Sequence, residues 1–301
     1  MKLLYYIVLV PLSRLPSSVL YGISDFLYVV IYRLAGYRKR VVRTNIRNSF
    51  PEKSRADQLK IERKFYVHFC DLIVESIKAF SISEEELAVR FVHRNPKIFE
   101  SYFDQGKTVT LVGGHYCNWE LFAVSVALHI AHKPVALFTP LSNKFMNAKI
   151  TESRSKYGLW MKNYAEIKEM ASNGLEKPVT VIFAADQCPR ISQQPHWVQF
   201  LNQETGVQFG TEKFARDFNT PVIYGVIHKT KRGHYEVEYR LVCENPHEIP
   251  LGRITEIHTS FLESDIINEP AFWLWTHKRW KRSRRDFEEY ALKENELAVT
   301  E

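Results

Sequence analysis

The sequence predicts an α/β fold, with a mostly parallel sheet flanked by helices and an N-terminal apolar membrane-anchor helix before it. Between residues 108 and 285, apolar β-type runs alternate with segments of helical periodicity, which is the order typical of a parallel sheet. Residues 1–36 differ, because they hold two aromatic-rich apolar runs that a basic cluster follows. These observations divide the chain into an anchor, residues 1–36, and a globular domain, residues 37–301.

The composition is that of a folded protein with anionic partners. The 301 residues are 45% hydrophobic and 13% aromatic, which is enough to bury a core and unlike a disordered chain. The formal charge of +7 favours nucleic acid, anionic lipid or an acidic carrier protein, without choosing among them. The four cysteines are scattered and lack metal-ligand spacing, so neither a metal site nor a disulfide framework is predicted.

The two apolar runs of the anchor cover residues 3–12 and 19–31. Neither reaches the roughly 20 uninterrupted apolar residues that a membrane span requires, and no cleavage site follows them. Three interpretations stay open: a marginal transmembrane helix, an interfacial anchor, and an aromatic-rich helix packed on the globular domain. Tyrosines favour an interface, and the basic residues that follow place that side in the cytoplasm.

The globular domain begins with a basic connector at residues 37–53. Residues 54–80 have the apolar spacing of an amphipathic helix, and residues 108–285 form the predicted α/β core. The strands expected in that core are residues 109–112, 135–138, 179–184, 222–228 and 235–241, the last two as a possible antiparallel pair. The expected helices are residues 119–131, 147–155, 165–172, 212–218 and 254–266. A loop is expected at residues 189–195.

The first strand of the core leads into a candidate active site. It ends in Gly113-Gly114, and His115 follows, with Glu120 five residues later at the start of a helix-like run. A histidine between a strand and a helix lies at the rim of a sheet, where it can act as a general base. The glycines allow close backbone approach and leave N–H groups near a helix N-terminus, where an oxyanion would bind. Glu120 is the candidate partner that orients His115. Cys117 as a nucleophile is the weaker alternative.

A second strand end carries Asp186 and Gln187. Ligands of α/β sheets bind beyond the carboxyl ends of the strands. His115 and Asp186 both fall at such ends, so they are predicted to share one site. Asp186 could hold Arg154 or the acceptor, and Asn118 could cap a helix or contact the substrate.

Several segments together resemble the bacterial lipid A late acyltransferases, within the wider lysophospholipid and glycerol-phosphate acyltransferase superfamily. They are the His-x4-Glu motif after Gly-Gly, the basic segment at 37–54, the helix at 65–75, Asp186-Gln187, and a segment rich in Trp, His and Arg at 270–281. The resemblance runs from about residue 20 to 285. It implies a glycerol-phosphate-acyltransferase-like fold.

The resemblance also implies a function. The expected activity is a membrane-associated O-acyltransferase that moves a fatty acyl chain from a thioester, of acyl carrier protein or coenzyme A, to a hydroxyl of a lipid A precursor. It would lie on the cytoplasmic face of the bacterial inner membrane and use no metal or cofactor, since the thioester is a co-substrate. His115 and Glu120 would be catalytic. The expected substrate-binding residues are Arg154, whose fork suits a phosphate, with Asp186, Gln187 and Asn118.

A basic run near the C-terminus is a solvated face or a patch for lipid phosphates or an acidic carrier. Its residues are Lys278, Arg279, Lys281, Arg282, Arg284 and Arg285. Nucleic acid is not expected as a partner, because no nucleic-acid-binding signature accompanies the run. Two alternative functions remain: the same chemistry on a lysophospholipid or aminolipid, and a non-catalytic scaffold that binds anionic lipid.

Overall fold

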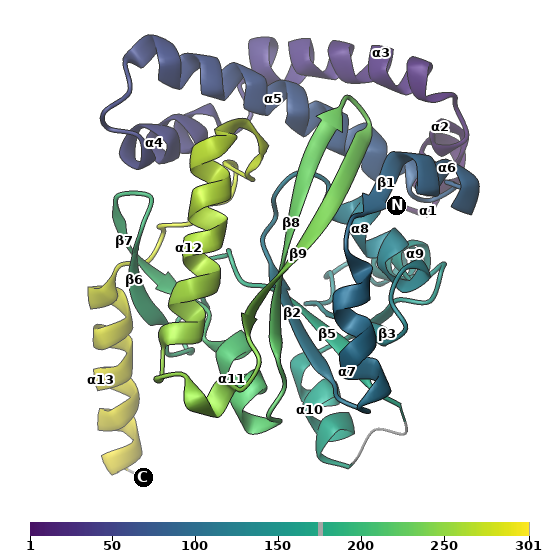
Figure 1. Ribbon diagram of the computed structural model, residues 1–301. Helices are drawn as coiled ribbons and strands as arrows, with labels where there is room; N and C mark the ends of the chain where they lie inside the picture. Colours follow the sequence, from purple (N-terminus) through teal and green to yellow (C-terminus); the bar gives the residue numbers. More distant parts are fainter. Residues whose placement is uncertain (174–176, 301) are drawn as a thin grey trace.

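A computed structural model describes residues 1–173 and 177–300 and has a seven-stranded sheet at its centre (Figure 1). The strand order is β1-β9-β8-β2-β5-β3-β4, and only the β8–β9 pair is antiparallel. The predicted mostly parallel α/β fold is therefore confirmed, and so is the hairpin of the last two predicted strands. The strands are β1 (Phe91–His93), β2 (Val109–Gly113), β3 (Lys133–Leu137), β4 (Trp160–Lys162), β5 (Val179–Ala184), β8 (Val222–Lys231) and β9 (His234–Cys243).

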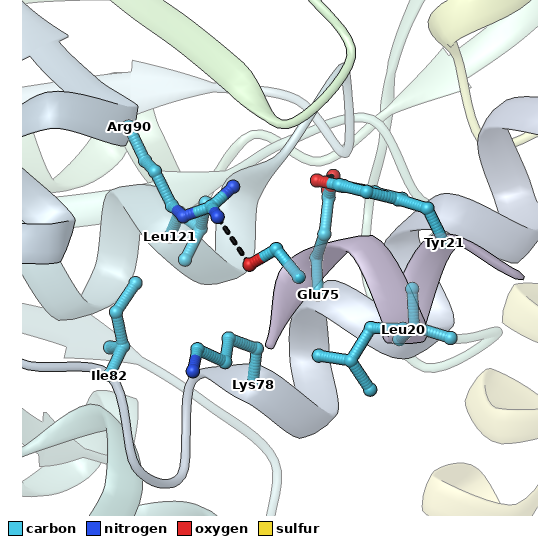
Figure 2. Close-up of a pocket in the computed structure, with 9 residues that line it drawn as sticks. Leu20, Tyr21, Glu75, Lys78, Ile82, Arg90 and Leu121 are labelled. Carbon is cyan, nitrogen blue, oxygen red and sulfur yellow. Dashed lines mark hydrogen bonds between the residues drawn. The ribbon is translucent and has the colours of Figure 1, made fainter. Parts of the chain in front are cut away.

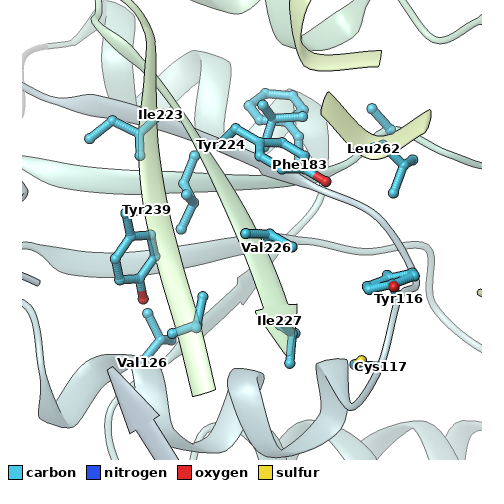
Figure 3. Close-up of a cluster of buried hydrophobic side chains, with 14 of the residues drawn as sticks. Tyr116, Cys117, Val126, Phe183, Ile223, Tyr224, Val226, Ile227, Tyr239 and Leu262 are labelled. Atoms are coloured by element: carbon cyan, nitrogen blue, oxygen red, sulfur yellow. The ribbon is translucent and has the colours of Figure 1, made fainter. Parts of the chain in front are cut away.

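The central strands β2 and β5 are buried on both faces. Such strands read as continuous apolar runs, which is why the sequence predicts them well. Helices α11 (Gly210–Asp217) and α12 (Arg253–Asn268) pack on one face of the sheet, and α8 (Trp119–Ser125) lies on the other. Figure 3 shows part of the buried cluster around β8 and β9, with Tyr224 and Val226 near Leu262 of α12.

The remaining elements surround this core. The helices are α6 (Glu84–Arg90), α7 (Glu100–Asp104), α9 (Lys144–Arg154), α10 (Tyr164–Ser172) and α13 (Arg284–Thr300), with short 3₁₀ turns at Pro96–Phe99, Val126–Leu128, Pro246–Glu248 and Pro270–Phe272. Strands β6 (His196–Phe200) and β7 (Gln203–Val207) form a separate antiparallel hairpin. The sequence prediction lacks this hairpin and the short strands β1 and β4.

The N-terminal residues form helices that pack on α5 (Arg55–Lys78) (Figure 1). They are α1 (Lys2–Leu4), a π-helical stretch (Tyr5–Leu9), α2 (Val10–Ser13), and α3 (Ser17–Tyr28) with its π-helical continuation (Val29–Leu34). Leu20 and Tyr32 are buried against the domain. The geometry therefore matches the third interpretation of the segment, an aromatic-rich helix packed on the globular domain.

No single helix in the described part of the chain combines the length and apolar composition needed to cross a bilayer. The segments Ser17–Leu34 and Lys39–Ser49 meet those criteria only as a pair, and the chain bends by 86° between them.

The basic connector predicted at residues 37–53 is largely a helix, α4 (Lys39–Ser49). Its inner side buries Val42, Asn45, Ile46 and Ser49, which recur at helical spacing. The sequence prediction missed this helix because only two of these four residues are apolar, and the basic residues between them dominate the composition.

Candidate active site

His115 and Asp186 meet at the carboxyl end of the sheet. Strands β2 and β5 are parallel neighbours, and their register pairs Gly113 with Ala184. His115 and Asp186 each lie two residues beyond this pair. The Ala185 N–H donates to the Gly113 carbonyl at 3.1 Å. The matched strand ends bring together His115 and Asp186, as their positions in the sequence predict.

The Asp186 carboxylate fixes the imidazole through several hydrogen bonds. His115 Nδ1 lies 2.7 Å from Asp186 Oδ1, and the His115 backbone N–H donates to Oδ2 at 2.9 Å. The indole Nε1 of Trp273 also donates to Oδ2, at 2.9 Å. Because a carboxylate only accepts hydrogen bonds, Nδ1 carries the proton and Nε2 keeps its lone pair. The side-chain amide of Gln187 lies 3.3 Å from that Nε2.

The two glycines before His115 are required by close contacts. A β-carbon on Gly114 would lie 3.0 Å from both terminal methyl groups of Leu262 and 3.3 Å from the carboxyl carbon of Asp186. A β-carbon on Gly113 would lie 3.1 Å from the Gly225 carbonyl oxygen. A side chain at Gly114 would therefore have to displace the Leu262 side chain and press against the Asp186 carboxylate.

Glu120 has a different partner from the one that the sequence predicts. It forms an ion pair with Arg154 of α9, in which Nε donates to Oε2 at 2.9 Å and Nη2 to Oε1 at 2.6 Å. The prediction that Glu120 orients His115 by a hydrogen bond is thus wrong, because Asp186 occupies Nδ1. The reason is local: Glu120 lies in the first turn of α8, which faces α9, whereas Nδ1 faces the end of β5.

The charges of the site favour protonation of His115. Burial alone would lower its pKa, but the charge of Asp186, the hydrogen bond to it and the charge of Glu120 raise the pKa above the ordinary value. Burial would raise the pKa of Asp186, yet His115 and the Trp273 hydrogen bond hold that pKa well below its usual range. Glu120 therefore still stabilises an imidazolium, through its charge rather than by contact.

The bidentate edge of Arg154 is occupied by Glu120. Its Nε and Nη2 form one of the two edges that can donate a pair of hydrogen bonds to a phosphate. Arg154 is also not held by Asp186, which the sequence left as a possibility. Arg154 therefore pairs with Glu120 in this structure, and the predicted phosphate contact would have to use the remaining N–H groups of its guanidinium.

Asn118 and Cys117 are both fully buried. Asn118 Oδ1 caps α8 by accepting from the Leu121 N–H at 2.9 Å, and its Nδ2 donates to Glu75 at 2.6 Å. The helix-cap interpretation is right, and the substrate-binding assignment of Asn118 is wrong. Cys117 is fully buried, and burial raises the pKa of its thiol well above its ordinary range, so both its position and its protonation state count against a thiolate nucleophile.

The segment around Trp273 holds the catalytic turn from the far side. Tyr116 and Trp273 form an isolated β-bridge, the Cys117 N–H donates to Phe272 at 3.0 Å, and the Leu274 N–H donates to His115 at 3.2 Å. The sequence prediction missed Trp273 as a partner of Asp186. The only available signal was the Trp-rich segment itself, whose spacing says nothing about its target.

The predicted basic patch is not one continuous surface. Arg279 is only 3% exposed and donates to the Gly206 carbonyl, so its assignment to the patch is wrong. Arg284 pairs with Glu204, and Arg285 pairs with Glu289. Arg282 donates to the Pro189 carbonyl, in the loop that follows Asp186 and Gln187. Lys278 and Lys281 remain exposed.

An apolar groove of about 150 Å³ runs from His115 between the sheet and α8. Arg154 also lines it, and the other lining side chains are almost all apolar. They include Leu111, Phe122, Ala123, Ala136, Leu137, Met161 and Ile182. A groove of this kind suits an extended hydrocarbon chain whose reactive end lies near the imidazole.

A histidine held by a buried carboxylate, beside an apolar groove, is the arrangement expected of an α/β enzyme that activates a nucleophile toward a lipid-like substrate. The family model for bacterial lipid A biosynthesis acyltransferases matches residues 1–282. The chain therefore belongs to that family and is an acyltransferase. No curated protein matches the chain.

Replacing Asp186 by Asn tests the electrostatics of the site. The variant loses the charge that stabilises imidazolium, so we expect kcat to fall by roughly 10²–10⁴-fold. A neutral His115 is the active form, and the carboxylate raises its pKa. The acidic limb of kcat/KM should therefore move to lower pH in the variant, as measured by pH–rate profiles.

Glu120→Gln is the matched control, because it removes a carboxylate that acts on His115 without touching it. Its shift should have the same sign and be smaller. An Asp186→Asn enzyme with the wild-type pH profile and wild-type kcat would contradict the assigned pairing.

Proposed function

We propose that the protein transfers a fatty acyl chain from an acyl thioester to a hydroxyl group of a lipid A precursor, with His115 as general base. The observation that carries this proposal is the His115–Asp186 pair, whose imidazole lines the apolar groove and whose Nε2 faces the Gln187 amide. Membership of the lipid A acyltransferase family supports the acceptor class.

The chemistry follows from the orientation of the imidazole. The acceptor hydroxyl attacks the thioester carbonyl while Nε2 removes its proton, and a C–O bond forms. Collapse of the tetrahedral intermediate breaks the C–S bond, and the imidazolium returns the proton to the leaving thiolate. Asp186 and Glu120 stabilise the imidazolium between these steps. Neither step requires a metal ion or a resident cofactor, because the thioester is already activated.

Gln187 is the best-placed donor for the oxyanion. Its amide lies 3.3 Å from His115 Nε2, where the acceptor hydroxyl must bind. When the hydroxyl takes that place, the amide is released to donate to the carbonyl oxygen, which is bonded to the same carbon that the hydroxyl attacks. The backbone N–H of His115 does not fill this role, because Asp186 already accepts from it.

Two kinds of acyl donor and two kinds of lipid acceptor are compatible with this chemistry. Acyl carrier protein is strongly acidic, and the exposed Lys278 and Lys281 lie a few residues after Trp273, the indole of which contacts Asp186. These two cations suit an acidic carrier protein and also the phosphates of coenzyme A, and turnover with each thioester as donor distinguishes them. The same site chemistry would serve a lysophospholipid acceptor, and lipid analysis distinguishes the two.

His115→Ala tests the mechanism. Loss of a general base should lower kcat by at least about 100-fold, with the protein still folded, because the imidazole lies at a rim of the sheet. The measurement is turnover of purified enzyme with an acyl thioester and a lipid A precursor, together with mass spectrometry of lipid A from cells that carry the variant. We expect lipid A that lacks one acyl chain. Wild-type turnover in a folded variant would exclude this mechanism. An unchanged lipid A together with an altered phospholipid profile would show that the acceptor is a lysophospholipid instead.

Ala136→Leu tests whether the groove holds the acyl chain. Ala136 lines the groove, so a larger side chain should shorten the space available. We expect the ratio of kcat/KM for long over short acyl donors to fall roughly tenfold or more, because one methylene in an apolar pocket is worth about 1–3 kcal/mol. Ala131→Leu is the control, since Ala131 is exposed and does not line the groove. Equal selectivity in both variants would place the chain elsewhere.

We further propose that the N-terminal helices contact the membrane. Among the described residues, 22 large apolar side chains are exposed, and 11 of them lie in the first 37 residues. Ile7 and Phe26 are 63% and 66% exposed. Basic residues of α4 and of the turn before it follow at once, as anionic headgroups require.

The double variant Ile7→Glu, Phe26→Glu tests this contact. We expect binding to anionic lipid vesicles to fall at least tenfold, since burying one such side chain contributes about 1.5–3 kcal/mol. The control is Leu251→Glu, Ile267→Glu, which changes side chains of similar exposure (75% and 54%) outside the N-terminal helices. Wild-type vesicle binding by the first variant in high salt would refute an apolar contact at these positions.

A further inference from the structure

The buried carboxylate of Glu75 joins three parts of the fold. It lies in α5 at 5% exposure and accepts a hydrogen bond at each of its oxygens. The Tyr21 hydroxyl of α3 donates to Oε1 at 2.8 Å, the Asn118 amide donates to Oε2 at 2.6 Å, and the Tyr235 hydroxyl of β9 donates to Oε2 at 2.7 Å. In Figure 2 the side chains of Tyr21 and Glu75 point toward one another from neighbouring helices.

Asn118 transmits this contact to the active site. Its other side-chain atom, Oδ1, caps α8, whose first turn carries Glu120. The residue before it, Cys117, has a left-handed backbone with φ of 51°. A non-glycine residue adopts that conformation only where its surroundings hold it. Those surroundings include the hydrogen bond from Asn118 to Glu75 as well as the backbone hydrogen bond from Cys117 to Phe272.

A second carboxylate of α5 makes the contact of Tyr21 distinctive. Asp71 accepts from Ser24 of α3 at 2.8 Å and pairs with Lys229 and Arg232. That contact fastens α3 to the domain, and its partner Lys229 also interacts with the Cys117 thiol. Among the described residues, however, Asp71 makes no hydrogen bond to Asn118. Tyr21 alone connects α3 to the carboxylate that Asn118 also uses.

We propose that Glu75 is a positioning residue that links α3 to the catalytic turn. Tyr21 of α3 donates to Glu75, Glu75 fixes Asn118, and Asn118 fixes the turn between His115 and Glu120. The N-terminal helices are then part of the catalytic machinery as well as a membrane contact. The activity readout of this inference rests on the proposed acyl transfer, whereas its structural readout does not.

Tyr21→Phe is the variant that tests the connection, because it removes one hydroxyl and keeps the ring. Tyr28→Phe is the matched control: it makes the same change in the same helix, at a hydroxyl with no hydrogen bond to a residue that the structure describes. We expect Tyr21→Phe to lower kcat about tenfold, which corresponds to about 1.4 kcal/mol. KM for both substrates and vesicle binding should stay within about twofold of wild type, as a change confined to the catalytic turn requires.

Hydrogen exchange supplies the readout that does not depend on activity. Amides of residues 116–121 should exchange faster in Tyr21→Phe than in the wild type or in Tyr28→Phe. A double-mutant cycle with Glu75→Gln should be non-additive, because both changes act on one carboxylate.

Two results would overturn the inference: a Tyr21→Phe enzyme with wild-type kcat, or one whose exchange at residues 116–121 is unchanged. A fall in melting temperature without either effect would leave Glu75 a purely structural residue and would count against the proposal. Failure of the proposed function is separate, since it would appear as full turnover in His115→Ala and would leave the exchange prediction standing.

Discussion

The hydrogen bond between His115 and Asp186 is the constraint on which the rest of the site depends. It exists only because β2 and β5 pair in parallel with Gly113 opposite Ala184. A slip of one residue would turn every side chain to the other face of the sheet and separate the pair. The small volume of Gly114 then lets the turn approach Asp186. The geometry of the site thus requires both the register of β2 with β5 and the absence of a side chain at Gly114.

The two acidic residues of the site have different environments and therefore different effects. Asp186 is almost fully buried and touches the imidazole, so it sets both the tautomer and the pKa. Glu120 is more exposed and is shared with Arg154, so its charge is partly neutralised before it acts on His115. A single carboxylate in contact is therefore enough to orient the base, and the second modulates the field around it.

The sequence predicts where the site lies better than it predicts which side chains pair within it. Strand ends are visible as apolar runs that stop, so the fold class places His115 and Asp186 at the same edge of the sheet. Their contact also requires β2 and β5 to be neighbours, which the strand order supplies. The partner of Glu120 could not be predicted in this way. Its spacing from His115 suggested a pair, but the cap at Asn118 turns Glu120 toward Arg154, which lies 34 residues further along the chain. Side-chain pairing across elements depends on helix orientation, and spacing within one segment does not contain that information.

Helix α5 explains why the N-terminal helices pack on the domain in one defined position. Its buried carboxylates Asp71 and Glu75 would destabilise the fold if left unpaired, and α3 supplies donors to both, from Ser24 and Tyr21. An apolar surface alone would allow α3 to slide or rotate, whereas two buried acceptors admit one register. The outer side of α3 carries exposed apolar residues such as Phe26 and has no comparable constraint. The helix is therefore specified by polar contacts on its inner side, and its outer side is left free for the proposed contact with lipid, so that seating and membrane binding can be altered independently.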